Sequence, residues 1–223
     1  MELLKDNCEI AKDVFEQVDK YNQNGIIICI TNPLDVITTV IQKVTNRDRK
    51  KVIGTGTLLD SARLARYIAG LVELSPDSVS VDVVGEHGNS SVPLLSSCRI
   101  CGKTLEDYFV DEVGGGLISA ERLARIVREA GFKIFSNKGH TSYGVACAAC
   151  RIVSVIIRDN RQILPVSVVL DGEYGLNGIA LSTPCVIGRE GIAAVKEISM
   201  TENERELFLK SANVVREAVN SIE

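Results

Sequence analysis

The chain has 223 residues, 45% of them hydrophobic, so it is long enough to bury a sizeable core in one domain or two. Its 29 acidic and 25 basic side chains give a formal net charge of -4, and no Lys/Arg cluster is interleaved with aromatic residues. A nucleic-acid partner or an acidic membrane is therefore not expected. The apolar runs fall far short of the roughly 20 residues that span a bilayer, and the first residues do not read as a signal peptide, so we expect a cytoplasmic protein.

The N-terminal quarter alternates helices with short apolar strands. Apolar side chains at helical spacing between residues 4 and 18 predict an N-terminal amphipathic helix that ends near Gly25. Strands are expected at 26–30 and 51–54, with a helix over 34–44 between them. Strand, helix and strand in this order imply two parallel strands joined by a crossover.

The next segment leads to one of only two histidines in the chain. Asp60 is expected to cap a helix over 61–72, and the alternating β-branched residues of 78–84 predict a strand. Glycines on both sides of His87 permit a tight turn that exposes its imidazole at the end of this strand. With a pKa of about 6.5, the imidazole is a candidate acid and base. Taken alone, such a turn more often holds a histidine that merely bonds its own loop.

Beyond residue 90 the pattern changes from crossovers to hairpins. The expected elements are a strand or hairpin over 91–103, a short helix over 104–109, a glycine loop at 114–116, a helix over 119–137 kinked at Gly131, a buried helix over 143–158, and antiparallel strands over 164–170 and 179–187. A last helix begins with Thr201 and Glu204 in capping-box spacing. Its expected inner face consists of Leu207, Ser211, Val214, Ala218 and Ile222.

The seven cysteines do not resemble a secreted disulfide framework, so reduced thiols are expected. Two CxxC pairs, Cys98 with Cys101 and Cys147 with Cys150, leave a zinc-stabilised scaffold open as an alternative. The second pair lies in the helix that is expected to be buried, where cysteine commonly serves as a small apolar residue. We therefore expect no metal site.

The segment Gly54-Thr-Gly56-Thr-Leu-Leu59 begins like the glycine-rich turn that seats a dinucleotide pyrophosphate on a helix N-terminus. Leu59 stands where a third glycine would allow close packing of helix and strand, so we expect a tight turn here and no pyrophosphate site. Asp60 and Arg63 follow three residues apart and share one helix face. A helix cap followed by a solvated arginine would give the same spacing.

Several distinctive segments follow one another along the chain: Thr31-Asn32-Pro33-Leu34-Asp35, the stretch from Gly54 to Arg63, Gly85-Glu-His87-Gly-Asn-Ser90, Lys138-Gly-His-Thr141-Ser-Tyr-Gly144, Leu164-Pro165-Val166-Ser167, Gly172-Glu-Tyr174-Gly175 and Val186-Ile-Gly-Arg-Glu-Gly191. In order, spacing and local structure they resemble the NAD-dependent L-lactate dehydrogenase family. The resemblance covers essentially all 223 residues. Malate dehydrogenases of the lactate dehydrogenase type share most of these segments and are the alternative.

The resemblance implies a role for each candidate residue. His87 would exchange a proton with the 2-hydroxyl of the substrate while hydride passes between the substrate carbon and NAD, and Asp60 would orient the imidazole. Arg63 would bind the substrate carboxylate through two parallel charge-assisted hydrogen bonds. Asn32 would contact the substrate oxygen, and Thr141 would line the pocket near the nicotinamide.

The same resemblance implies a fold between α/β and α+β. Residues 1–56 would be the C-terminal remnant of a Rossmann NAD-binding domain, with its last two parallel strands, and residues 57–223 the catalytic domain with antiparallel strands and long helices. Thr31 and Asn32 would form the remaining cofactor contacts, since the family's pyrophosphate turn and specificity loop precede the position that matches Met1. We therefore expect a truncated chain with impaired NAD binding and turnover.

The expected function is that of an L-lactate dehydrogenase acting on lactate and pyruvate with NAD, in a homodimer or homotetramer. Without the specificity loop, the sequence does not choose between lactate and malate. A non-catalytic module that only associates with other subunits is the alternative from a different functional class.

Overall fold

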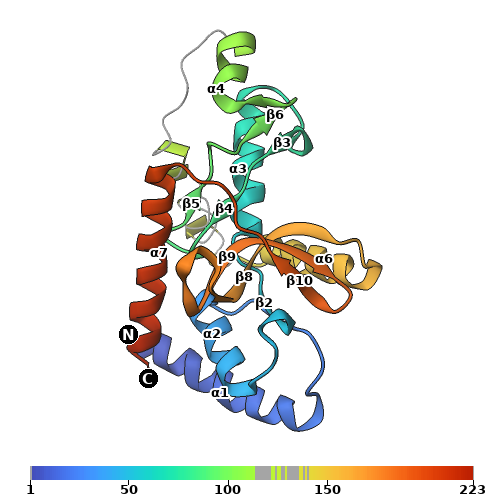
Figure 1. The fold of residues 1–223 in the computed structure, drawn as a ribbon, viewed down its shortest axis with the longest axis vertical. Coiled ribbons are helices and arrows are strands. Elements are labelled where there is room, and N and C mark those ends of the chain that lie inside the picture. Colours follow the sequence, from blue (N-terminus) through green and yellow to red (C-terminus); the bar gives the residue numbers. More distant parts are fainter. Residues whose placement is uncertain are drawn as a thin grey trace.

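The computed structural model shows an elongated molecule whose helices flank one mixed sheet (Figure 1). It describes residues 2–113, 122, 123, 125, 126, 129, 136, 137, 139 and 141–222. The helices are α1 (Glu2–Tyr21), α2 (Leu34–Thr45), α3 (Leu58–Leu71), α4 (Leu105–Tyr108), α6 (Tyr143–Arg158) and α7 (Glu202–Asn220). The strands are β1 (Ile27–Cys29), β2 (Val52–Gly54), β3 (Val79–Ser80), β4 (Val83–Val84), β5 (Val92–Pro93), β6 (Arg99–Ile100), β7 (Lys103–Thr104), β8 (Gln162–Asp171), β9 (Asn177–Gly188) and β10 (Gly191–Val195).

The two N-terminal strands and three C-terminal strands form one five-stranded sheet in the order β1-β2-β8-β9-β10. β1 and β2 are parallel, as the crossover pattern predicts, whereas β8, β9 and β10 pair antiparallel. The two parts join where Gly54 of β2 pairs with Ser167 of β8. All residues from 164 to 170 are buried, so β8 is covered on both faces. This mixed architecture agrees with the fold class between α/β and α+β that the sequence predicts.

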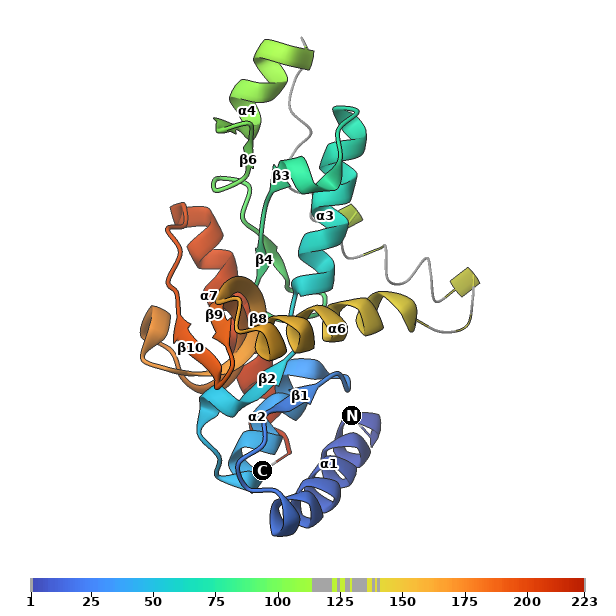
Figure 2. The ribbon, with the colours of Figure 1, turned by 90° about the vertical axis from the view of Figure 1, so that its right-hand side faces the viewer.

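Two hydrophobic cores meet in the middle of the molecule. The larger core surrounds the five-stranded sheet, and the smaller one lies in an arm made of α3, α4 and the sheet β3-β6-β7 (Figures 1 and 2). The boundary falls inside β4, because Val83 belongs to the core of the arm and Val84 to the larger core. Similarly, α3 begins in the larger core at Leu58 and enters the arm at Leu64. The first turn of α3 and the end of β4 are thus held between two packed bodies.

The single strand expected over 78–84 is wrong, because its two halves pair with different partners. β3 pairs with β6, and β4 pairs with β5, so the ladder is interrupted after Ser80. Asp60 is also not a helix cap. α3 begins at Leu58 after Thr57, and Asp60 is the third residue of the helix. Its carboxylate is therefore available to a partner outside the helix.

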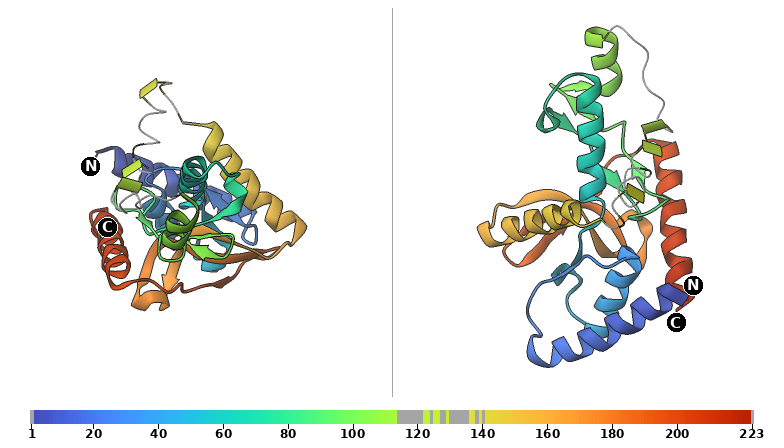
Figure 3. Two further views of the ribbon diagram at one scale, coloured as in Figure 1. Left: turned by 90° about the horizontal axis from the view of Figure 1, so that it is seen from above. Right: turned by 180° about the vertical axis from the view of Figure 1, so that it is seen from behind.

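The helix over 143–158 forms as expected, but the prediction that it is buried is wrong. Only one stripe of α6 is buried, formed by Ala148, Ile152 and Val155. Tyr143 is 74% exposed and Ile157 is 68% exposed. α6 lies at the periphery of the molecule, where its inner stripe contacts β9 (Figures 2 and 3). A helix that is apolar all round is expected to be enclosed, whereas the described residues bury only one stripe of α6.

α7 carries the predicted capping box between Thr201 and Glu204. The expected inner face is partly wrong, because Leu207 and Val214 are 42% and 44% exposed. The residues of α7 that are buried against the rest of the molecule are Glu204, Phe208, Ser211, Ala212, Val215 and Val219. The helical period fits two adjacent stripes equally well, and contact with β5 and β9 selects the stripe that contains Phe208.

Other predicted elements form with small shifts, and β10 is an additional strand that the pattern does not predict. The short helix over 104–109 appears as α4, whose cap is the Thr104 hydroxyl. The glycine loop at 114–116 and Gly131 lie outside the described residues, as does most of the helix expected over 119–137.

Gly85 should tolerate no side chain. Its φ is +86°, and a Cβ there would lie 2.6 Å from Ser211 Oγ. We expect Gly85→Ala to lower the free energy of unfolding by about 2–3 kcal/mol, since left-handed strain and a steric clash add. Urea denaturation measures the change. Gly178→Ala is the matched control, because Gly178 has a φ of +75° but a Cβ added there would meet no described atom within 4 Å. Equal losses in the two variants would contradict the clash.

Candidate active site

The turn that carries His87 is anchored through consecutive backbone N–H groups. Gly85 exchanges two hydrogen bonds with Ser182 of β9, at 2.9 and 3.0 Å. The Glu86 N–H donates to Ser211 Oγ of α7 at 2.8 Å. The His87 N–H donates to Asp35 Oδ2 of α2 at 2.7 Å. Three elements that are distant in sequence therefore fix the main chain under the imidazole.

The His87 ring faces the first turn of α3. Its Nδ1 lies 2.6 Å from Asp60 Oδ2, and Arg63 Nη1 donates to the other carboxylate oxygen, Oδ1, at 3.2 Å. The Asp60 side chain is 9% exposed, against 26% for His87 and 20% for Arg63. Because Nδ1 is engaged with Asp60, proton exchange with a ligand falls to Nε2, the opposite ring nitrogen. The sequence-predicted trio of His87, Asp60 and Arg63 is thus brought together.

The pKa of His87 is raised above its ordinary value of 6.5. Burial, the largest single influence, acts against this shift, but the hydrogen bond and negative charge of Asp60 together with the other charges outweigh burial. The charge of Asp35 also raises the pKa, whereas Arg63 lowers it. The site therefore favours the imidazolium, the form that results when a histidine accepts a proton from a hydroxyl.

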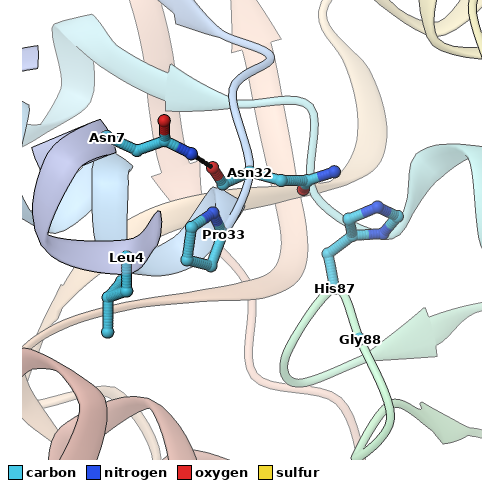
Figure 4. Close-up of a pocket in the computed structure, with 6 residues that line it drawn as sticks. All are labelled: Leu4, Asn7, Asn32, Pro33, His87 and Gly88. Atoms are coloured by element: carbon cyan, nitrogen blue, oxygen red, sulfur yellow. Dashed lines mark hydrogen bonds between the residues drawn. The ribbon is translucent and has the colours of Figure 1, made fainter. Parts of the chain in front are cut away.

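A cavity of about 530 Å³ lies beside the histidine, lined by Leu4, Asn7, Asn32, Pro33, His87 and Gly88 (Figure 4). Asn7 of α1 donates its side-chain N–H to the Asn32 carbonyl at 2.9 Å. This bond fixes the turn between β1 and α2, and the Asn32 side chain extends toward the His87 ring (Figure 4). Asn32 and His87, both predicted as site residues, thus share one cavity.

The remaining candidates are placed less directly. Thr31 is exposed just beyond the carboxyl end of β1, next to Asn32. Thr141 is exposed in the segment before α6. Neither residue, nor Arg63, is among those that line the cavity. The amide of Asn32 and the hydroxyl of Thr31 are polar groups of the kind that a dinucleotide needs, and they stand at the strand end where such ligands bind in α/β sheets.

The turn at Gly54 and Gly56 is a packing feature, as expected. A Cβ at Gly56, whose φ is +56°, would lie 2.6 Å from the Ser167 backbone nitrogen. A Cβ at Gly54 would lie 2.6 Å from Thr38 Oγ1 and 2.8 Å from Ser167 Cβ. Both glycines therefore allow β2 and the start of α3 to approach β8 and α2, and this approach explains them without a phosphate.

The zinc alternative finds no support in the positions of its ligands. Cys98 is buried in the core of the arm and Cys101 is exposed in the next turn, while Cys147 and Cys150 are exposed on α6. Over the described ranges, no three His, Cys, Asp or Glu side chains gather in a way that could hold a metal ion.

Among the described residues, the helices are too short or too polar to serve as membrane-spanning segments.

Sequence reasoning misses two anchoring residues of the site. It includes Asp35 only as part of a motif, and Ser211 only as part of a helix face. The signal for Asp35 is an acidic residue in the first turn of a strongly apolar helix, where it is 2% exposed. Ser211 gives no comparable signal, because a serine on the inner face of a helix has many ordinary explanations.

Two family models together match almost the whole chain. The lactate/malate dehydrogenase alpha/beta C-terminal domain matches residues 57–223, and the lactate/malate dehydrogenase NAD binding domain matches residues 1–54. The L-lactate dehydrogenase of Salinibacter ruber is 35% identical over 216 residues, which are 97% of this chain and 68% of the relative. That of Acetivibrio thermocellus is 35% identical over 225 residues, covering 100% of this chain and 71% of the relative.

The solved structures that resemble this chain include both malate and lactate dehydrogenases. A malate dehydrogenase from Aeropyrum pernix superposes with a TM-score of 0.91 at 34% identity, covering 100% of this chain and 73% of that one. The minor L-lactate dehydrogenase from Enterococcus mundtii, in its ligand-bound form, superposes with a TM-score of 0.95 at 29% identity, covering 100% and 71%.

The raised pKa of His87 predicts how stability depends on pH. The folded state holds this proton more tightly than the unfolded chain, so the stabilisation is complete below pH of about 6.5 and is lost as pH rises through the folded pKa. We expect the urea midpoint to fall as pH rises from about 6.5 through the folded pKa of His87. Asp60→Asn should make the urea midpoint less dependent on pH in this range. Glu106→Gln, an exposed change on α4, serves as control. A slope unaltered by Asp60→Asn would contradict the assignment.

Proposed function

Because this chain belongs to the lactate/malate dehydrogenase family, whose members are NAD-dependent oxidoreductases, we propose that its substrates are L-lactate and pyruvate. The observation that carries this proposal is the His87 imidazole, bonded to Asp60 and placed beside Asn32 in one cavity. Several curated relatives are named L-lactate dehydrogenase. Because the similar structures include malate dehydrogenases, malate and oxaloacetate are the alternative pair.

We propose that His87 accepts the proton of the substrate 2-hydroxyl at Nε2 and returns it in the reverse reaction. NAD, when bound, accepts or supplies the hydride. Asp60 keeps the Nδ1 side of the ring fixed and stabilises the imidazolium by a charge-assisted hydrogen bond. A base whose pKa lies near the working pH can both take and give a proton, which a reversible reaction requires.

Arg63, Asn32, Thr141 and Thr31 complete the proposed site. The Arg63 guanidinium carries five N–H donors, and its Nη1 contacts Asp60, so other donors can bind a substrate carboxylate. Asn32 would donate to the substrate oxygen from its place in the cavity, and Thr141 would close the pocket from the start of α6. Thr31 and Asn32 are the residues proposed to contact NAD at the end of β1.

We propose residues 1–56 as the nucleotide-binding part of the chain and residues 57–223 as the catalytic part. We also propose a homodimer or homotetramer, since α6 exposes apolar side chains that a second copy would cover.

A cytoplasmic location is proposed because the cysteines are free thiols, which a reducing compartment maintains.

The activity test is a pyruvate-dependent absorbance assay with NADH on the 223-residue chain, repeated with oxaloacetate, together with calorimetric titration of NADH. We expect pyruvate to be preferred, and His87→Asn to lower kcat/KM by about 10²- to 10⁴-fold because general acid and base catalysis is lost. The control is Glu190→Gln, because Glu190 is exposed and is distant in sequence from His87. A preference for oxaloacetate would favour malate dehydrogenase, and retained activity in His87→Asn would exclude the proposed base.

The role of Arg63 is tested by Arg63→Lys. A lysine keeps the charge but not the planar fork, so we expect KM for pyruvate to rise by about tenfold or more while the folded state persists. Steady-state kinetics measure KM, and circular dichroism verifies the fold. Unchanged KM would show that the Arg63 side chain serves Asp60 alone.

A further inference from the structure

We propose that Asp35 is a positioning residue for His87: its buried carboxylate ties the main chain of the histidine to α2 and β8, so that the imidazole meets Asp60. One oxygen, Oδ2, accepts the His87 N–H at 2.7 Å, and the other, Oδ1, accepts the Ser167 hydroxyl at 2.6 Å. Asp35 is 2% exposed and Ser167 is fully buried. The inference rests on the proposed role of His87 as the proton-transfer group.

The contact differs from an ordinary buried hydrogen bond because a carboxylate holds the peptide itself. Bonds to a charged acceptor are shorter and about twice as strong as neutral ones, and backbone donors leave no rotamer to adjust. The imidazole projects from this fixed peptide, so its 2.6 Å contact with Asp60 depends on where the His87 N–H is held. Asp35 thus acts on the ring without touching it.

Asp35 also links the histidine to the cavity. It lies in the first turn of α2, three residues after Asn32, so one short segment turns Asn32 toward the cavity and Asp35 toward the interior. The first turn of a helix favours a negative charge, which offsets part of the cost of burying a carboxylate there. A shift of this segment would therefore move the cavity wall and the histidine together.

Asp35 acts on His87 both through a hydrogen bond and through its charge, and a test must separate these two effects. Facing His87 are Asp60 and Arg63 of α3 and Asp35 of α2, while Glu86 also acts on Asp35. Burial raises the pKa of Asp35 to about 6, although Ser167 and the His87 N–H hold the charged form. The carboxylate is thus ionised above this pH, where it tethers the histidine and adds negative charge near the ring.

Variants of Asp35 and Ser167 separate the tether, which is the hydrogen bond from the His87 N–H to the Asp35 side chain, from the charge of the carboxylate. In Asp35→Asn the side-chain oxygen can still accept the His87 N–H while the NH₂ donates to the Ser167 hydroxyl, so the tether stays and the charge is lost. Asp35→Ala loses both. Ser167→Ala keeps the charge but removes one of the two groups that hold the carboxylate. Asp82→Asn is the matched control, because Asp82 is a partly buried carboxyl between β3 and β4 whose pKa burial also raises.

The experiment is nuclear magnetic resonance on the full chain, following amide exchange of His87 and titration of its imidazole. His140→Gln assigns the ring signals, since the chain has only two histidines. Asp35→Ala should speed His87 amide exchange by about tenfold or more and lower the imidazole pKa. Asp35→Asn should lower the pKa with much of the amide protection retained, and Ser167→Ala should speed exchange with a smaller change in pKa.

Activity gives an independent reading. A displaced imidazole should lower kcat by about 10²-fold in Asp35→Ala with little change in KM, and Asp35→Asn should restore part of the loss. If Asp35→Ala does not fold, Asp35→Asn and Ser167→Ala decide by the same two signals. The proposal is overturned if His87 amide exchange and the imidazole pKa in every folded variant of Asp35 and Ser167 are the same as in Asp82→Asn. Turnover by this chain is expected to be impaired, but its complete absence with both pyruvate and oxaloacetate would sink the proposed function, whereas the resonance data would still decide the role of Asp35.

Discussion

The position of one imidazole depends on how three successive peptide groups are held. The N–H groups of Gly85, Glu86 and His87 bond to β9, α7 and α2 in turn. None of these partners is close in sequence to the turn, so the chain must complete its sheet and its C-terminal helix before the histidine is fixed. Gly85 is the residue that makes the approach to Ser211 sterically possible. The placement of the site therefore depends on contacts with elements that are distant in sequence.

The electrostatics of the site follow from this placement. A histidine removed from water would lose its proton more easily, but here Asp60 and, at longer range, Asp35 reverse that tendency. Arg63 moderates the effect and pairs with the same Asp60 carboxylate. Because the two carboxylates come from α3 and α2, the basicity of His87 depends on how the arm and the sheet are joined. The boundary between the two cores inside β4 lies within a few residues of this junction.

The mixed sheet joins a pair of parallel strands, β1 and β2, to three antiparallel strands, β8, β9 and β10. Glycines at 54 and 56 allow β2 and the start of α3 to approach Ser167 closely. Ser167 also donates to Asp35, which holds His87. A short chain of contacts therefore runs from the sheet junction to the catalytic candidate, through buried polar groups that satisfy one another. Polar groups in such a position favour one arrangement strongly, because leaving any one of them unpaired is costly.

The sequence by itself determined the local features: the parallel crossover, the C-terminal capping box, the tight turn at Gly85, and the candidates His87, Asp60, Arg63 and Asn32. The first three follow from periodicity and turn chemistry, which act within a few residues, whereas the four candidates follow from the resemblance of their motifs to the dehydrogenase family. Only the tertiary structure decided that Asp60 points out of α3 to the imidazole, that α7 buries the stripe of Phe208, that α6 is exposed on one side, and that Asp35 holds the histidine. Each of these depends on which distant surface an element meets, and side-chain spacing along one segment carries no information about a partner far along the chain.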